Sequence, residues 1–167
     1  PKPGWGIDAY IDLYRFPWVS YRADLPSEGF NKLIQLFWKP HKKLEIYLRY
    51  QKESKSLNQS SVYMNLNELE AVARTGLRMQ TSFQPGPGFV IRNRIDLAWF
   101  EKQGIKEQGF QAYIDFIYKS NVKPYSLSAR IAWFQTGGYN SRIYGYEHDV
   151  LYYYAISALF DTGTRFY

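Results

Sequence analysis

The stretch LEIYLRYQKE at residues 44–53 has the alternation that decides the fold. Its even positions from Leu44 to Tyr50 are apolar, while the odd positions carry polar or amphipathic groups such as Glu45 and Arg49. Successive side chains of a β-strand point to opposite faces of the sheet. The stretch therefore predicts a strand with one apolar face and one polar face.

The same period of two recurs along the whole chain, and a helical period of 3.6 does not. Aromatic and β-branched residues are frequent in the alternating segments, which favours strands over helices. The predicted strands cover residues 7–14, 30–38, 44–53, 74–83, 91–99, 110–118, 125–133 and 144–156. Only residues 66–73 (LNELEAVA) could form a short helix, inside a connection. The sequence thus predicts an all-β, antiparallel up-and-down fold of about eight consecutive strands in one domain.

The connections between these strands alternate between short and long. Residues 39–43, 84–88 and 119–124 are short and hold the turn formers Pro and Gly, or Asn. Residues 15–28, 55–70, 101–108 and 136–141 are longer and polar. In an up-and-down sheet, all short turns then lie at one end and all long loops at the other. Transmembrane β-barrels of bacterial outer membranes have this asymmetry.

The composition narrows the class of protein. The 167 residues include 16 Tyr, 11 Phe and 5 Trp, which is too aromatic for a disordered chain. There is no Cys, so disulfides and thiol catalysis are excluded. No window is long and apolar enough for a transmembrane helix. The net charge of +6 is compatible with an acidic partner, such as nucleic acid or an anionic lipid surface.

A soluble up-and-down barrel would alternate in the same way, with its apolar face turned inward. Two observations favour lipid on that face. The predicted strands have about the length that crosses a bilayer when tilted. Apolar-face rings also gather at both strand ends around an aliphatic middle, as interfacial aromatic belts do. The predicted lipid-interface aromatics are Trp5, Trp38, Tyr50, Phe83, Trp99, Phe110, Tyr118, Tyr125 and Trp133.

The opposite face carries charges of both signs in the middle of the strands. The predicted lumen-facing residues are Glu45, Arg49, Arg78, Arg92, Arg94, Asp96, Asp115, Arg130, Glu147 and Asp149. Cross-strand ion pairs that fill a narrow lumen are the first interpretation. The second is a pore lining for anions or a polyanion. Eight strands leave room only for side chains, while more strands leave a channel. The final residues 160–167 read as a turn and the opening of a further strand, which suggests part of a larger barrel.

Several segments, taken in order, resemble one family. They are FPWVSYRADLPS (16–27), LEIYLRYQKESK (44–55), RNRIDL (92–97), EQGF (107–110) and GYNSRIYGYEHDVLY (138–152). Together they resemble the C-terminal β-barrel region of helix-hairpin-helix-domain, competence-protein-like outer-membrane proteins of Gram-negative bacteria. The resemblance implies a location in the bacterial outer membrane and an association with nucleic acid. No helix-hairpin-helix segment is recognisable in this chain.

Three functions compete on this pattern. The first is a pore, a transporter or a membrane-embedded subunit of a larger outer-membrane complex. The second is a barrel anchor that presents loops, or an attached DNA-binding domain, to a partner. The third and least favoured is an outer-membrane hydrolase built on Ser141 and His148. We expect no enzyme activity, cofactor or metal, because His41 lies in a basic turn and His148 between two residues of the opposite face. The expected partners are lipopolysaccharide, phospholipid and other outer-membrane or periplasmic proteins.

Overall fold

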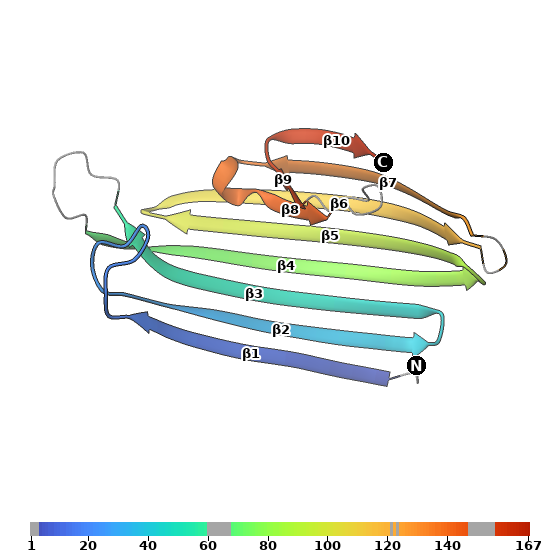
Figure 1. Ribbon diagram of the computed structural model, residues 1–167, viewed down its shortest axis with the longest axis horizontal. Coiled ribbons are helices and arrows are strands. Elements are labelled where there is room, and N and C mark those ends of the chain that lie inside the picture. Colours follow the sequence, from blue (N-terminus) through green and yellow to red (C-terminus); the bar gives the residue numbers. More distant parts are fainter. Residues whose placement is uncertain (1–3, 60–67, 121, 123, 147–155) are drawn as a thin grey trace.

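The fold is that of an antiparallel up-and-down β-sheet of eight strands, seen in a computed structural model (Figure 1). The structure describes residues 4–59, 68–120, 122, 124–146 and 156–167. Within these ranges, no helix has the length and apolar character needed to cross a membrane. The strands of the main sheet are β1 (Gly4–Phe16), β2 (Ser27–His41), β3 (Leu44–Asn58), β4 (Leu69–Gly86), β5 (Phe89–Lys102), β6 (Ile105–Lys119), β7 (Ser126–Thr136) and β10 (Thr162–Phe166).

Alternation along each strand sorts the side chains onto two faces, as the sequence predicts. The register aligns residues of the same kind across neighbouring strands, so that each face is continuous. One cross-strand row of aliphatic side chains comprises Ile7, Leu36, Leu48, Met79 and Ile95. The adjacent row on the other face holds Gln35, Arg49, Arg78 and Asp96. From β2 to β5 the sheet therefore has one mainly apolar face and one mainly polar face.

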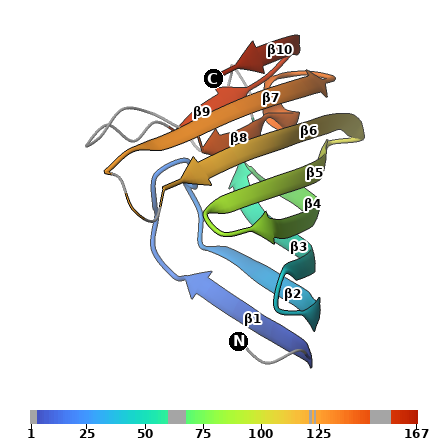
Figure 2. The ribbon, with the colours of Figure 1, turned by 90° about the vertical axis from the view of Figure 1, so that its right-hand side faces the viewer.

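The sheet is curved (Figure 2). The polar face is the concave one, because its side chains Asp96, Asp115 and Arg130 are buried, whereas large side chains of the apolar face are exposed. A second, two-stranded sheet of β8 (Ile143–Tyr146) and β9 (Ile156–Leu159) lies on the concave side, preceded by the single-turn 3-10 helix η1 (Tyr139–Ser141). Residues 137–146 form the inward-folded segment, which approaches β6 closely at Gly109. A Cβ atom there would lie 2.3 Å from the carbonyl oxygen of Ser141, so only glycine permits the contact.

The eighth strand of the main sheet is not the predicted one. Of the expected strand at 144–156, the first residues form β8, which pairs with β9, and residues 147–155 lie outside the described ones. The edge position is taken by β10, which pairs with β7. Two hydrogen bonds hold the start of β10 beside the end of β7. The amide of Thr136 donates to the carbonyl of Asp161 (2.8 Å), and the amide of Asp161 donates to the Thr136 hydroxyl (2.9 Å).

Two predicted connections were also wrong. The possible helix at 66–73 is a strand from Leu69 onward, because Leu69 to Ala73 pair with the end of β3 and bury Val72. The long connection at 101–108 is a two-residue turn at Gln103 and Gly104, both with positive φ (49° and 78°). Such turns match the twist of the strands they join. The predicted alternation of short and long connections therefore fails at this point.

The eight strands form an open sheet. β1 and β10 are its two edges, and no pairing between them closes it into a barrel. The described part of the chain therefore has two edges that further strands can extend. The prediction of an all-β, antiparallel, up-and-down architecture is confirmed, and closure is not observed.

Candidate functional site on the concave face

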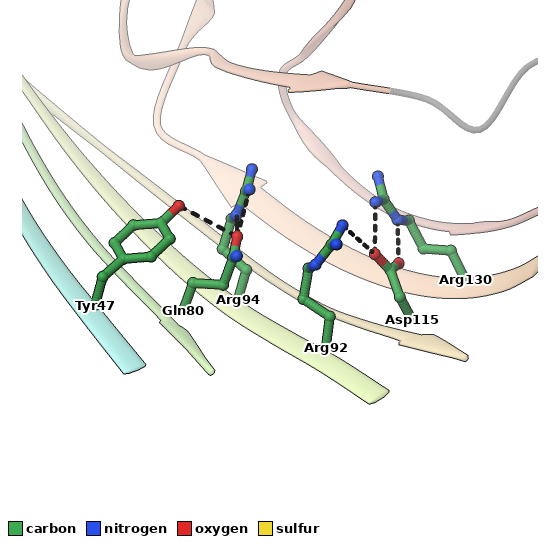
Figure 3. Close-up of polar contacts among 6 residues, drawn as sticks. All are labelled: Tyr47, Gln80, Arg92, Arg94, Asp115 and Arg130. Atoms are coloured by element: carbon green, nitrogen blue, oxygen red, sulfur yellow. Dashed lines mark hydrogen bonds and ion pairs between the residues drawn. The ribbon is translucent and has the colours of Figure 1, made fainter. Parts of the chain in front are cut away.

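The register brings the predicted charged residues together on the concave face. They occupy adjacent rows of β3 to β7: Glu45, Arg49, Arg78, Arg92, Arg94, Asp96, Asp115 and Arg130. The remaining two, Glu147 and Asp149, lie outside the described residues. The charged face is the candidate site, and Figure 3 shows its central part.

Asp115 on β6 anchors the centre of this face (Figure 3). Its carboxylate is fully buried and accepts two hydrogen bonds from the equally buried Arg130 on β7, at 2.5 Å from Nε and 2.9 Å from Nη2. Arg92 approaches the same carboxylate from β5, with 3.8 Å between Nη1 and Oδ2. One acid thus sits between two arginines from neighbouring strands. This bidentate geometry is the strong form of the arginine–carboxylate interaction.

A second network lies beside the first, and Figure 3 shows its side chains. Arg94 donates from Nε (2.8 Å) and Nη2 (2.5 Å) to the amide oxygen of Gln80, which also accepts from the hydroxyl of Tyr47 (3.2 Å). The ring of Tyr113 lies between two guanidinium groups, 5.1 Å from that of Arg94 and 4.0 Å from that of Arg130. Cation–π contacts of this kind hold a guanidinium plane in place.

Toward the strands of the N-terminal half, the pattern continues with single pairs. Arg78 forms an ion pair with the buried Asp96 (2.5 Å), and Arg49 donates to the amide oxygen of the buried Gln35. Buried charges are tolerated only when such partners are present. The concave face is therefore a polar core in which many charges and amides are paired across strands, while Arg92 Nε and Gln111 Oε1 are buried without a hydrogen-bond partner among the described residues.

Some residues of this face were not predicted as site residues. They include Tyr47, Gln80 and Tyr113, which are uncharged. Each lies an even number of residues from a charged residue of its strand, and this spacing could have predicted that they share the polar face. Arg74 has the same spacing on β4. Its Nη2 donates to the carbonyl oxygens of Asn140 (3.1 Å) and Arg142 (2.7 Å) on the inward-folded segment. No sequence signal indicated this contact, because residues 136–141 were expected only to be a polar connection between two strands.

The inward-folded segment is held from a second side by Glu107. Its carboxylate accepts the backbone amides of Asn140 and Ser141, both at 3.1 Å, and the side-chain amide of Asn140 at 2.8 Å. The hydroxyl of Ser141 is buried and donates to the carbonyl of Gly138 (3.1 Å). His148, its partner in the hydrolase alternative, lies outside the described residues. Ser141 therefore has a structural role in this segment.

The other histidine, His41, lies at the end of β2, far along the chain from Ser141. It is the exposed last residue of that strand, and its Nδ1 accepts a hydrogen bond from the amide of Lys43 (3.2 Å). Within the ranges that the structure describes, no group of three His, Asp or Glu residues could hold a metal ion. The chemistry that the described face offers is therefore ionic and hydrogen-bonding.

The predicted aromatics lie on the opposite, convex face. Most of them are exposed, and three pairs are in ring contact: Trp5 with Trp38 (5.2 Å between centroids), Phe110 with Trp133 (5.2 Å) and Tyr118 with Tyr125 (6.2 Å). The exposed ones are Trp5, Trp38, Tyr50, Phe83, Trp99, Tyr118, Tyr125 and Trp133, and Phe110 is half-buried. Large apolar side chains thus remain on the surface.

Compared with known proteins, the chain matches no protein-family model, no curated protein and no solved structure. The resemblance to helix-hairpin-helix-domain outer-membrane proteins stays a prediction. The function has to be argued from the geometry of the two faces.

Proposed function

We propose that the chain supplies membrane-spanning strands to a β-barrel of a bacterial outer membrane, with the concave face lining a polar lumen. It acts there as a pore or transporter, or as the membrane-embedded subunit of a larger complex. One observation carries the proposal: charged groups are buried on one face of the sheet, and large apolar side chains are exposed on the other. Asp96, Gln111, Asp115 and Arg130 are buried, while aliphatic and aromatic side chains cover the convex face.

Water is a poor solvent for such a convex face. Ile7, Leu36, Leu48, Met79 and Ile95 form one unbroken row of exposed aliphatic side chains. Soluble monomers rarely expose apolar patches of more than a few hundred Å². Lipid tails solvate this surface without the free-energy cost that water imposes. The proposal therefore assigns lipopolysaccharide and phospholipid as the partners of the convex face.

The extent of the apolar band supports the same solvent. On β6 it runs from Phe110 to Tyr118, about 26 Å along the strand at 3.3 Å per residue. A tilt of about 40° reduces this to about 20 Å along the membrane normal, near the height of about 25 Å that is typical of outer-membrane barrels. Beyond the apolar band, toward the start of β2 and the end of β3, the convex face carries Lys32 and Lys52, which are paired across the two strands. Charges thus begin where an interface with water is expected.

The open edges agree with a larger barrel. A transmembrane sheet needs every backbone group paired, so that only closed barrels span a bilayer. Further strands, joined at β1 and β10, complete the barrel in this proposal. With more than eight strands, the lumen has room for water as well as for the ion pairs of the concave face.

The test of the membrane assignment is extraction and gel mobility. We expect the protein to stay with the membrane until detergent is added and to migrate faster on gels without heating than after boiling, as folded outer-membrane barrels do. Recovery in the aqueous fraction without detergent would overturn the assignment. A monomeric soluble sheet of this size would be recovered there.

The pore is tested by single-channel conductance in planar bilayers. Arg92 and Arg130 flank Asp115 in the lumen, so Arg92→Ala and Arg130→Ala are expected to change the conductance or the ion selectivity. Lys106→Ala is the matched control, because this side chain is 71% exposed and forms only a surface ion pair with Glu101. A membrane-integrated protein without any conductance would reject the pore and leave the role of a complex subunit.

A further inference from the structure

A hollow on the concave face lies between the sheet and the inward-folded segment. It has a volume of about 290 Å³, close to the lower end of the range of ligand pockets, about 300–1,000 Å³. Four arginines and two carboxylates line it: Arg49, Arg74, Arg78 and Arg142, with Glu53 and Asp96. The hollow is therefore small, and its charged side chains are mainly positive.

The floor of the hollow consists of the small residues Gly76 and Ala98, which are paired across β4 and β5. Arg74 and Arg78 project from the same face of β4 on either side of Gly76, about 13 Å apart along the strand at 3.3 Å per residue. A Cβ atom at Gly76 would meet nothing closer than 3.9 Å, so open space lies above the floor. The two arginines thus stand at the ends of a gap that no side chain of the sheet fills.

The arginines around this gap are not equally neutralised. Arg78 is paired with Asp96. Among the described residues, no carboxylate lies within ion-pair distance of Arg49, Arg74 or Arg142. Arg49 has the neutral partner Gln35, and Arg74 has two carbonyl oxygens. Surplus positive charge therefore faces the hollow.

Arg142 forms the roof and is held in a fixed orientation. Its Nε donates to the hydroxyl of Tyr144 (2.7 Å) and its Nη1 to the carbonyl of Tyr139 (2.9 Å). Its guanidinium also lies 4.3 Å from the centre of the Tyr139 ring. A guanidinium held in this way loses little conformational entropy when a ligand binds. The Arg142 guanidinium is therefore already positioned to bind an anion in the hollow.

We propose that this hollow binds a small soluble anion that carries a phosphate or carboxylate group, with Arg74 and Arg142 as its main ligands. Arginine forks match the geometry of both groups and bind them through paired charge-assisted hydrogen bonds. The proposal deepens the function proposed above, because it names the class of solute that the lumen selects. It rests on that function only for the statement about transport, and binding itself is independent of a bilayer.

A second cavity, which is also lined by basic residues, provides a path for the anion into the hollow. It has a volume of about 480 Å³ and shares Glu53, Arg74 and Arg142 with the hollow. Its additional basic residues are Arg22, Lys55 and Lys102, of which Lys55 is paired with Glu53 and Lys102 with Glu70. Positive charge thus continues from the end of the sheet near β3's last residues into the hollow, and such a path raises the local concentration of anions.

Isothermal titration calorimetry of the full chain in detergent micelles, with inorganic phosphate and with succinate as probes, tests the binding. We expect binding to the wild type and affinities at least about tenfold lower in Arg74→Gln and in Arg142→Gln, because each variant loses charge-assisted hydrogen bonds to the anion. Gly76→Leu keeps every charge but fills the hollow, and it is expected to abolish binding. Lys106→Gln is the control and keeps binding, because this lysine is exposed and lies outside the hollow.

Three outcomes would overturn the proposal. They are no binding of either probe to a correctly folded wild type, unchanged affinity in the Arg74→Gln, Arg142→Gln double variant, and unchanged affinity in Gly76→Leu. Folding of each variant is checked by heat-modifiable gel mobility. Titration with micelles that contain an anionic phospholipid separates the source of the anion: binding to the lipid phosphate alone would overturn the assignment to a soluble solute. Failure to conduct in bilayers, with binding intact, would reject the pore and keep the site.

Discussion

The carboxylate of Asp115 and the guanidinium of Arg130 form a bidentate pair that is sealed from solvent at the centre of the concave face. In a soluble sheet, this position would hold an apolar core. Here Asp96, Asp115 and Arg130 are buried beside apolar side chains such as Ala132 and Phe134, and the charged partners come from neighbouring strands. Stability on this face therefore depends on the pairing of these charges, and a lost partner leaves a buried charge behind.

Asp115→Asn tests this dependence. It leaves Arg130 buried and Arg92 nearby without their carboxylate, so we expect a loss of about 3–5 kcal/mol in the free energy of unfolding, as for other broken buried pairs. Urea unfolding in detergent micelles measures the loss. Glu101→Gln is the control, because the Glu101–Lys106 pair is exposed and is expected to contribute less than about 1 kcal/mol. Equal effects in the two variants would contradict the view of a buried charged core.

Leu48→Arg tests the solvent of the convex face. Leu48 lies in the middle of the aliphatic row and is 42% exposed. In a bilayer an arginine there should cost about 2–4 kcal/mol, whereas an exposed position in water should tolerate it within about 0.5 kcal/mol. Unfolding in phospholipid vesicles gives the value. Lys52→Arg, on the same face but above the apolar band, serves as the control. A neutral result at Leu48 would speak against lipid contact.

Gly104→Val tests the turn between β5 and β6. Gly104 has a φ of 78°, and a β-branched residue in this region is strained by about 1–2 kcal/mol. The midpoint of urea unfolding should fall accordingly. Gly86→Val is the matched control, because Gly86 lies at the end of β4 without a positive φ and its Cβ would meet no atom within 4 Å. A loss of similar size in both variants would show that strand or turn propensity, and not the positive φ, is responsible.

Gly109→Ala tests the seat of the inward-folded segment. Its Cβ would lie 2.3 Å from the carbonyl oxygen of Ser141, so the segment has to move away from β6. We expect faster tryptic cleavage after Arg142, which is half-buried in the wild type. The Gly76→Ala variant adds a methyl group to the same face without a clash and should be cleaved at the wild-type rate. Unchanged cleavage in Gly109→Ala would show that the contact can be relieved locally.

The alternation of side chains made most of the main sheet predictable. In LEIYLRYQKE the parity of each residue fixes the face on which it lies, and the same holds for Arg92, Asp96 and Asp115 on β5 and β6. Parity says which residues share a face, but not which ones touch. The contact of Arg130 with Asp115 depends on the register, and the turns between strands set that register.

Elements governed by local backbone geometry or by distant contacts were not predictable in this way. The two-residue turn at Gln103 and Gly104 was not predicted, because the residues that flank it are polar and resemble a long loop. Residues 69–73 have a helical composition, and pairing with the end of β3 overrides it. The inward course of residues 137–146 depends on Glu107 and Arg74, which hold its backbone from two other strands. Neither contact leaves a pattern in the sequence.

The pairing of β10 with β7 has a consequence for the order of assembly. From β1 to β7 every strand pairs with its neighbour in sequence, so that the sheet can grow by one hairpin after another. β10 instead closes a loop of about 25 residues, whose entropic cost exceeds that of a two-residue turn by about 2 kcal/mol. Contacts that close longer loops form later. The edge of β7 is therefore the last to be occupied during folding, and an assembly factor that captures nascent strands would find it open longest.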